Sequence, residues 1–154
     1  MGDKTPVSAL VLVYTPDLRV LLLERADFAG YWQSVTGSQE PGETLAQTAT
    51  RELLEETGID AAVYGGVIDW GMSNDYEIFP QWRHRYPAGT THNTEHVFGL
   101  SVPAPIPVRL HPREHIACEW LPWQTAADKC FSWSNRAAIE QLPQRVSNQA
   151  RANA

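Results

Sequence analysis

The amino-acid sequence predicts an α/β fold in which a mixed β-sheet is combined with two or three helices. Short runs rich in β-branched residues recur along the chain, and helix-favouring segments lie between and after them. Strands interleaved with helices are typical of a sheet that is covered by helices. The 154 residues match the usual size of one domain, and no repeat or linker divides them. We therefore expect a single domain over residues 1–142 and a flexible C-terminal tail over residues 143–154, where the chain turns polar.

Two extended runs begin the chain. Val7–Tyr14 is rich in β-branched residues and ends at a turn signal, residues 15–17 with the sequence Thr-Pro-Asp. Arg19–Glu24 follows as a second apolar run, so we expect the two runs to form a hairpin. A loop is expected at residues 26–30, and a short segment at residues 31–36 follows it.

The strongest helix signal covers residues 44–57. This segment contains no Gly or Pro and is dense in Ala, Leu, Glu and Gln, which favour helices. Thr44 and Gln47 have the spacing of a capping box at a helix start. Gly58 stands where a left-handed residue commonly ends a helix.

The second half of the chain contains weaker signals. A strand is expected at residues 61–72, although two consecutive glycines interrupt it, and residues 76–86 are rich in aromatic and basic side chains. The elements expected after residue 86 are a loop at 87–93, strands at 95–102 and 118–121, and helices at 124–129 and 134–142.

Composition excludes several classes of function. The chain has 18 Asp and Glu against 12 Lys and Arg, a net charge of -6, which argues against binding nucleic acid or an anionic membrane. No apolar run reaches the roughly 20 residues that span a bilayer. The two cysteines, Cys118 and Cys130, form no metal-binding spacing, and no secretory signal is recognisable at the N-terminus. We expect a cytoplasmic protein.

An acidic cluster near the end of the predicted helix indicates a metal site. At about 100° per residue, Leu45, Ala49 and Leu53 form one apolar stripe, and Glu52 and Glu56 lie one turn apart along its border. Like charges at this spacing, near the negative end of the helix dipole, oppose helix formation. A solvated acidic face is the alternative interpretation. A hard divalent cation such as Mg²⁺ or Mn²⁺ would remove the repulsion, so a metal site is the favoured hypothesis.

The same segment resembles a known family. The Nudix box, G-x5-E-x7-R-E-U-x-E-E-x-G-U with U aliphatic, is matched at each fixed position by Gly37, Glu43, Arg51, Glu52, Leu53, Glu55, Glu56, Gly58 and Ile59. This resemblance implies the Nudix α/β/α sandwich and Mg²⁺-dependent hydrolysis of a nucleoside diphosphate linked to another group. It also implies that Glu52 and Glu56 are the main metal ligands and that Glu55 acts through water. A carbonyl near Thr36 would be a further ligand, and Glu43 with Arg51 would brace the loop on the helix.

A further acid outside the box often completes the metal site in this family or acts as the base. Glu77, Glu95 and Glu114 are the candidates, and each could instead be an ordinary surface residue. His115 could orient such an acid or be a structural histidine. The sequence leaves these alternatives open.

The flanking residues resemble the Nudix subgroup that hydrolyses dihydroneopterin triphosphate in folate synthesis. The similar stretches include YWQSVTGS at 31–38, RHRY at 83–86, NTE at 93–95 and SWSNR at 132–136. The resemblance implies that Glu114 is a third metal ligand. It implies a substrate pocket lined by Lys4, Arg25, Thr36, Tyr76, Glu77, Ile78, Phe79 and Ser132. Ala26 and Tyr76 differ from the residues common in that subgroup, which leaves their contacts open.

Local chemistry agrees with a triphosphate substrate. Lys4, Arg25 and the Arg83–Arg85 segment supply cations, although residues 83–85 could equally be a solvent-facing strand edge. Phe79, Trp32 or Trp133 could stack on a flat ring. The expected reaction is in-line attack of water on a phosphorus atom, with metal-polarised phosphate and Glu52 or Glu114 as the base.

Two other functions stay open at this point. A Nudix pyrophosphatase acting on dATP or oxidised dGTP would use the same chemistry with a different base pocket. A non-catalytic Nudix domain that only binds a nucleotide is a second alternative, although the box carboxylates that such a protein would be expected to lose are all present. The sequence does not determine the number of metal ions or the oligomeric state.

Overall fold

The computed structural model describes residues 2–152, and within them seven strands form one mixed sheet. Five strands follow the order β3-β2-β1-β6-β5, while β4 pairs with β1 and β7 pairs with β2. The strands are β1 (Val7–Tyr14), β2 (Arg19–Arg25), β3 (Trp32–Gln33), β4 (Val35–Ser38), β5 (Ile68–Glu77), β6 (His92–Ser101) and β7 (His115–Pro122). Strands β1 and β6 run parallel, and the other pairs are antiparallel.

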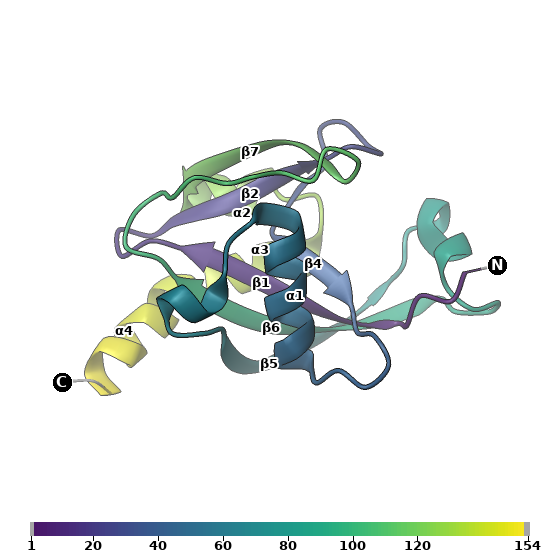
Figure 1. The fold of residues 1–154 in the computed structure, drawn as a ribbon, viewed down its shortest axis with the longest axis horizontal. Helices are drawn as coiled ribbons and strands as arrows, with labels where there is room; N and C mark the ends of the chain where they lie inside the picture. Colours follow the sequence, from purple (N-terminus) through teal and green to yellow (C-terminus); the bar gives the residue numbers. More distant parts are fainter. Residues whose placement is uncertain (1, 153–154) are drawn as a thin grey trace.

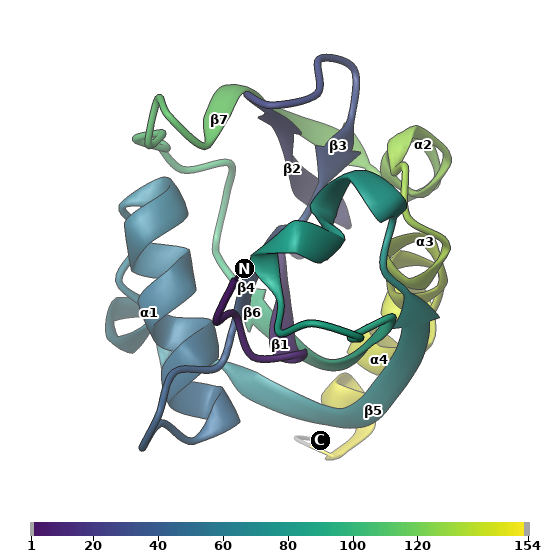
Figure 2. The same ribbon diagram turned by 90° about the vertical axis from the view of Figure 1, so that its right-hand side faces the viewer.

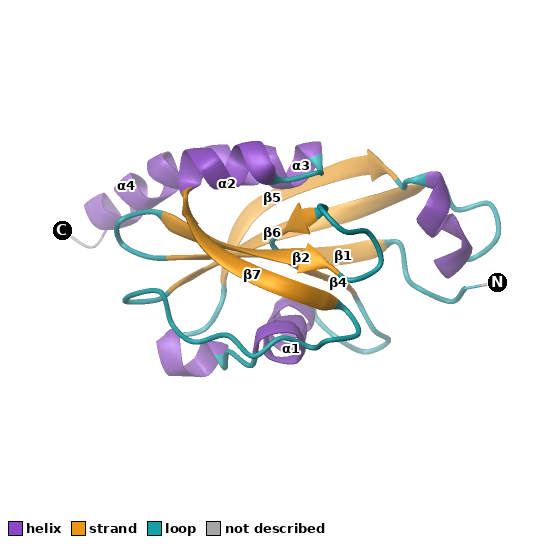
Figure 3. Ribbon diagram, turned by 90° about the horizontal axis from the view of Figure 1, so that it is seen from above, coloured by secondary structure: helices purple, strands orange, loops and turns teal. Residues whose placement is uncertain are grey.

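Helices cover both faces of the sheet, as Figures 1 and 2 show. The α-helices are α1 (Leu45–Thr57), α2 (Trp123–Lys129), α3 (Trp133–Glu140) and α4 (Leu142–Ala152), and the 3-10 helices are η1 (Ala61–Tyr64) and η2 (Pro80–Arg85). Helix α1 lies on one face, and α2, α3 and α4 lie on the other (Figure 3). This arrangement confirms the predicted α/β/α sandwich.

Strand β1 is the centre of the core. Its inward residues alternate between two apolar clusters: Val11 packs toward α1, and Leu12 packs toward α2 and α3. The residues from Ala9 to Tyr14 are all buried, because a strand covered on both faces buries every side chain. The uninterrupted apolar sequence of this strand therefore reflects its central position.

Helix α1 forms as predicted. Thr44 caps it, and the Thr44 and Gln47 side chains make both hydrogen bonds of the capping box. Gly58 ends the helix with φ of 74°, a left-handed conformation that glycine adopts without a steric penalty. Ala49 and Leu53 are buried against the sheet.

The predicted hairpin is present but short, and part of another predicted strand is a 3-10 helix. Strands β1 and β2 pair antiparallel beside their turn, at Tyr14 and Val20, and β2 pairs along its length with β7. Residues 61–64 form η1 instead of a strand, because the Asp60 side chain caps that turn at the amide of Ala62. Strand β5 begins only at Ile68, after the two glycines.

Two further segments are helical. Residues 83–85, considered as a possible strand edge, lie in the 3-10 helix η2. The segment after residue 142, where we predict a flexible tail, continues as α4, in which Arg145 donates to the Trp70 carbonyl over 2.7 Å and lies over the Trp70 ring. Val146 packs on the same core cluster as Leu142, so an apolar i, i+4 pair holds this polar helix to the sheet.

Candidate active site

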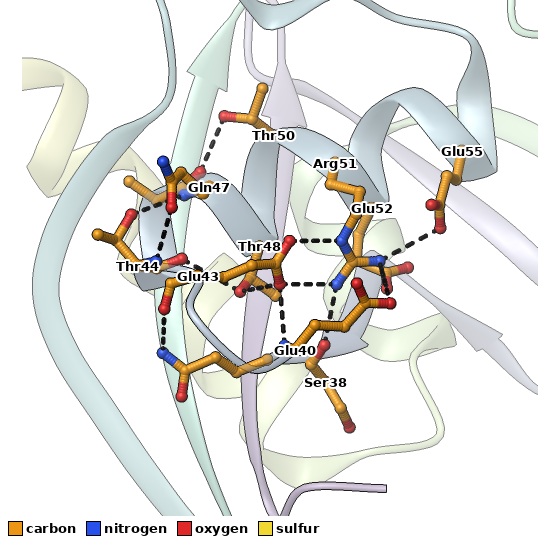
Figure 4. Close-up of polar contacts among 12 residues, drawn as sticks. Ser38, Glu40, Glu43, Thr44, Gln47, Thr48, Thr50, Arg51, Glu52 and Glu55 are labelled. Carbon is orange, nitrogen blue, oxygen red and sulfur yellow. Dashed lines mark hydrogen bonds and ion pairs between the residues drawn. The ribbon is translucent and has the colours of Figure 1, made fainter.

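Arg51 organises the loop before α1 and the helix itself into one charged network (Figure 4). Its guanidinium donates to both carboxylate oxygens of Glu43, over 2.6 and 3.0 Å, and to the Ser38 carbonyl over 3.1 Å. It also donates to Glu52 over 2.7 Å and to Glu55 over 3.3 Å. The hydrogen bonds from Arg51 lower the pKa of Glu43 to about 2. This bidentate pair fixes the loop on the helix, as the family resemblance implied.

The pKa values of Glu52 and Glu56 are raised, whereas that of Glu43 is lowered. The Glu56 side chain is 2% exposed, and its Oε1 has no hydrogen-bond partner within residues 2–152. Burial and the neighbouring Glu52 raise the pKa of Glu56 well above its usual value. Burial likewise raises the pKa of Glu52, although Arg51 opposes the shift. Two adjacent carboxylates, one buried and one partly buried, are an unfavourable arrangement when both are ionised unless a cation lies between them.

The backbone beside these acids is shaped for close approach. A Cβ atom at Gly37 would collide with the Glu52 carboxylate and its Cγ, so only glycine lets this side chain lie against β4. The Thr36 backbone amide hydrogen-bonds to Glu56 and lowers its pKa in part. These residues fit a hard divalent cation, which binds through one or two carboxylates, water and substrate phosphates.

A cavity of about 860 Å³ opens over Glu52 and Glu56, and we call it the acidic cavity. Glu114 lines it from the turn before β7, and its charge contributes to the raised pKa of Glu56. Glu55 does not line the acidic cavity, and it is half exposed beside Arg51. Within the part of the chain that the structure describes, no three acidic, His or Cys side chains already converge as a metal-ligand set.

His115 lies at the back of the acidic cavity. Its Nε2 is 3.8 Å from Oε1 of Glu56 and 3.4 Å from the amide nitrogen of Gln33. Burial lowers the pKa of His115 to about 4, so the ring is neutral near pH 7. A neutral ring therefore supplies no positive charge to the neighbouring Glu56.

A second cavity of about 560 Å³ adjoins the acidic cavity, and we call it the ring cavity. Its aromatic side is formed by Phe79, Trp82 and Phe131, with Phe79 and Trp82 stacked at 5.4 Å. All eight residues that the resemblance assigned to the substrate pocket line this cavity: Lys4, Arg25, Thr36, Tyr76, Glu77, Ile78, Phe79 and Ser132. The structure thus brings together residues from both ends of the chain.

Three cations stand where the two cavities meet. Lys4, Arg25 and Arg85 line both cavities. Asp27 holds the Arg25 guanidinium through two hydrogen bonds of 2.8 Å, and the guanidinium lies 4.2 Å from the centre of the Trp82 ring. Burial, followed by the charges of Arg85 and Arg25, lowers the pKa of Lys4. Crowded cations beside crowded acids suit a polyanion that binds between them together with a metal.

Several lining residues were missed by sequence reasoning. Gln33 accepts a hydrogen bond of 3.1 Å from Arg25, and Ser8 and Asn135 line the polar side of the ring cavity. Glu95, considered above as an acid for the metal site, lines the ring cavity and not the acidic one. Its position between Asn93 and the apolar residue Val97 on one face of β6 was the available signal for an inward-facing carboxylate.

Known proteins resemble this chain over most of its length. The NUDIX domain model matches residues 4–142. The chain is 48% identical to the dihydroneopterin triphosphate diphosphatase of Escherichia coli strain K12, over 90% of this chain and 93% of that protein. It is 39% identical to the Haemophilus influenzae protein of the same name, over 91% and 89% of the two chains.

Solved structures give the same relationship. The E. coli dihydroneopterin triphosphate pyrophosphohydrolase superposes with a TM-score of 0.86 at 46% identity, covering 92% of this chain and 97% of that one. A C. elegans Ap4A hydrolase shares the fold, with a TM-score of 0.70 at 18% identity over 92% and 98% of the two chains. Nudix hydrolases generally use a divalent metal ion. Gly37, Glu52 and Glu56 of the box line the acidic cavity, and the chain belongs to the Nudix hydrolase family.

Proposed function

We propose that this protein hydrolyses dihydroneopterin triphosphate to dihydroneopterin monophosphate and pyrophosphate, in a Mg²⁺-dependent step of folate biosynthesis. The observation that supports this most strongly is the pair of adjoining cavities with Lys4, Arg25 and Arg85 at their junction. A flat ring fits the aromatic cavity, and a triphosphate attached to it extends past these cations toward the acids. The names of the E. coli and H. influenzae relatives agree with this substrate.

The cations at the junction bind and orient the phosphates. Asp27 and Gln33 hold the Arg25 side chain in one conformation, so little entropy is lost when the guanidinium pairs with a phosphate. Lys4 is tethered by its backbone amide, which donates to the Arg85 carbonyl over 3.0 Å. Phosphate oxygens that pair with these groups relieve the repulsion among them. The same contacts position a phosphorus atom next to the acidic cavity.

Glu52, Glu56 and Glu114 are the residues that would hold the metal, and the carbonyl near Thr36 is a further ligand. A bound Mg²⁺ would polarise a phosphate oxygen and lower the pKa of a water molecule. Glu52 and Glu114 are the two carboxylates we assign as candidates for the base, because both line the cavity in which water reaches the phosphorus. Glu55, which lies outside the cavity, acts through water at most.

Substrate binding needs no partner protein and no nucleic acid in this proposal. Among residues 2–152, the helices are too short or too polar to cross a bilayer. Cys118 and Cys130 are free thiols, as expected in a reducing compartment, and we place the protein in the cytoplasm.

A turnover panel tests the proposal directly. The products of hydrolysis with Mg²⁺ are separated and quantified for dihydroneopterin triphosphate, dATP, 8-oxo-dGTP, ADP-ribose and diadenosine tetraphosphate. We expect kcat/KM for dihydroneopterin triphosphate to exceed each of the others by at least roughly tenfold, because a pteridine joined to a triphosphate would span both cavities. Equal rates on all the triphosphates would refute the assignment, and no metal-dependent turnover of any of them would identify a binding protein.

A further inference from the structure

Glu95 is a buried carboxylate that the proposed chemistry leaves without a role. It lies on β6 between Ser8 of β1 and Asn74 of β5, its neighbours in the two paired strands. The residue is 4% exposed and lines the ring cavity. Its Oε1 has no hydrogen-bond partner among the residues that the structure describes. An unpaired carboxylate oxygen at this depth is costly, so a donor from outside the chain would relieve it.

A second acceptor stands two residues earlier on the same face of β6. The Asn93 side chain donates through Nδ2 to Ser8 over 2.8 Å and to the Tyr76 hydroxyl over 3.0 Å. Both donor contacts fix the amide orientation, and Oδ1 of Asn93 remains unpartnered within residues 2–152. The ring cavity therefore has two buried, unpartnered acceptors along one strand.

The surrounding groups leave few other donors for these oxygens. Asn135 donates to the Ser34 hydroxyl over 3.0 Å and accepts from its amide over 2.8 Å. A hydrogen bond from Ser134 partly offsets the effect of burial on Glu95, and the Ser134 hydroxyl is also 2.9 Å from that of Ser132. The polar side chains near Glu95 are thus mostly committed to one another.

We propose that Glu95 is the specificity residue of the ring cavity and that it recognises a 2-amino-4-oxo pteridine. Its carboxylate accepts one hydrogen bond from the ring N–H and one from the adjacent amino group. Asn93 Oδ1 accepts a hydrogen bond from the other amino hydrogen. This inference rests on the proposed function and defines the chemical class of ring that the site takes. Two parallel N–H donors match a carboxylate as a guanidinium does. A ring that lacks the amino group leaves a buried carboxylate oxygen unpaired, which is a strong basis for rejection.

The position of Glu95 agrees with the direction in which the substrate must lie. The aromatic residues Phe79 and Trp82 offer a face for the ring, and the junction cations lie between the ring cavity and the acidic cavity. A ring held at its amino edge by Glu95 would extend its phosphorylated side chain toward Lys4 and Arg25. The three sets of contacts bind three different parts of one molecule.

A structural role for Glu95 is the rival explanation. The Asn74 amide, its neighbour across the sheet, is also buried without a partner in the described part of the chain. If Glu95 served only to support this strand pair, a change of ring chemistry would not alter its effect. The deciding readout is therefore ligand discrimination and not stability.

The test measures binding of neopterin and of its 2,4-dioxo counterpart, which has an oxo group in place of the amino group, by pterin fluorescence in the absence of metal. We expect the wild-type protein to prefer neopterin by at least roughly tenfold. Glu95→Gln should weaken neopterin binding by roughly 10- to 100-fold and abolish the preference. Glu95→Asp, which keeps the carboxylate, should retain a reduced preference. Asp75→Asn is the matched control, because Asp75 is an exposed acid of β5 that pairs with Thr94.

The outcomes separate the inference from the proposed function. Preference for neopterin that persists in Glu95→Gln overturns the inference, whether or not dihydroneopterin triphosphate is hydrolysed. If wild-type protein discriminates between the rings through Glu95 but fails to hydrolyse dihydroneopterin triphosphate, only the proposed function is refuted. Circular dichroism checks that each variant is folded, and Glu95→Asp provides the test if Glu95→Gln is not.

Discussion

The acidic cavity and the ring cavity share a wall but place their buried charge differently. In the acidic cavity, Glu52 and Glu56 lie one turn apart and repel each other when both are ionised, and a cation between them would relieve the repulsion. In the ring cavity, burial and not a neighbouring acid raises the pKa of Glu95, and a pair of N–H donors would satisfy its unpartnered carboxylate. Repulsion between acids thus marks the site of chemistry, whereas a single unpartnered carboxylate marks the site of recognition.

This difference predicts which kinetic constant each cavity controls. Groups that act on the developing charge change kcat, whereas groups that bind the ring equally in ground and transition states change KM. Substitutions in the two cavities should therefore separate cleanly when both constants are measured on dihydroneopterin triphosphate.

The largest effect is expected from Glu56→Gln in the acidic cavity. Loss of this carboxylate should lower kcat by roughly 1,000-fold, since it removes a metal ligand while the ring contacts stay in place. The variant should be at least as resistant to heat as the wild-type protein in chelator, because a buried, poorly partnered charge is removed. Steady-state kinetics and thermal unfolding measure the two quantities. Glu140→Gln, an exposed change on α3, is the control, and near-normal kcat in Glu56→Gln would contradict the metal assignment.

The second prediction concerns stability and pH in the ring cavity. Burial raises the pKa of Glu95 from 4.5 to about 7, so the native protein holds a proton that the unfolded chain releases. The contribution of this group to the free energy of unfolding is therefore largest below pH 4.5. It decreases by about 3 kcal/mol in total as the pH rises from 4.5 through 7. Glu95→Gln does not titrate and should gain about 2 kcal/mol on the wild-type protein between pH 5 and pH 8.

Urea unfolding in chelator at several pH values measures this difference. Tyr76, Tyr86 and Cys130 also lie near Glu95, but burial raises the pKa of each, so all three stay neutral over this range. A stability difference between Glu95→Gln and wild type that is independent of pH would show that the carboxylate is not buried as described.

A third prediction tests the wall of the acidic cavity through Gly37→Ala. The added methyl group would collide with the Glu52 carboxylate, and the backbone of β4 is held by its pairing with β1. Displacement of a metal ligand should lower kcat by roughly 10- to 100-fold with little change in KM. Gly89→Ala, in a loop where φ is 85° and an added methyl has no heavy atom within 4 Å, controls for backbone strain away from the site. Unchanged kcat in Gly37→Ala would show that Glu52 can move without consequence.

The smallest effect is expected from Phe79→Ala on the aromatic side of the ring cavity. Removing this face should raise KM by roughly 2- to 10-fold, the usual range for one aromatic pair, and leave kcat nearly unchanged. Val63→Ala, which shortens an exposed side chain on η1, is the control. A fall in kcat of the same size as the rise in KM would indicate that the ring cavity also positions the phosphates.

The sequence predicts most of the fold because its strongest signals are local. The capping box at Thr44, the left-handed Gly58 and the apolar run of β1 each specify structure through neighbouring residues. The extent of the hairpin was not predictable, because strand pairing is not local: β1 and β2 pair beside their turn, and β2 pairs along its length with β7, which lies more than ninety positions later. The polar α4 helix was missed because Arg145 and Val146 gain their contacts only from the folded sheet.

The residues of the candidate site also divide into those that local sequence signals identify and those that only the folded sheet brings together. Glu52 and Glu56 are readable from helical spacing within the Nudix box, and the substrate-pocket residues came from the family resemblance. Glu95 could not be assigned to either cavity from sequence, because its neighbours Ser8 and Asn74 come from strands that only the sheet topology brings together. Nothing in the sequence distinguishes Arg83 from Arg85. Only the η2 turn gives them different surroundings, because Arg83 pairs with Glu77 and Arg85 lines both cavities.

Comparing Glu56→Gln with Glu95→Gln on dihydroneopterin triphosphate at saturating Mg²⁺ tests the division of labour between the cavities most directly. The structure predicts that Glu56→Gln lowers kcat with KM within about threefold of wild type. It predicts that Glu95→Gln raises KM by roughly tenfold or more with kcat nearly unchanged. If both variants change the same constant to a similar extent, the two cavities do not act separately and the account is contradicted.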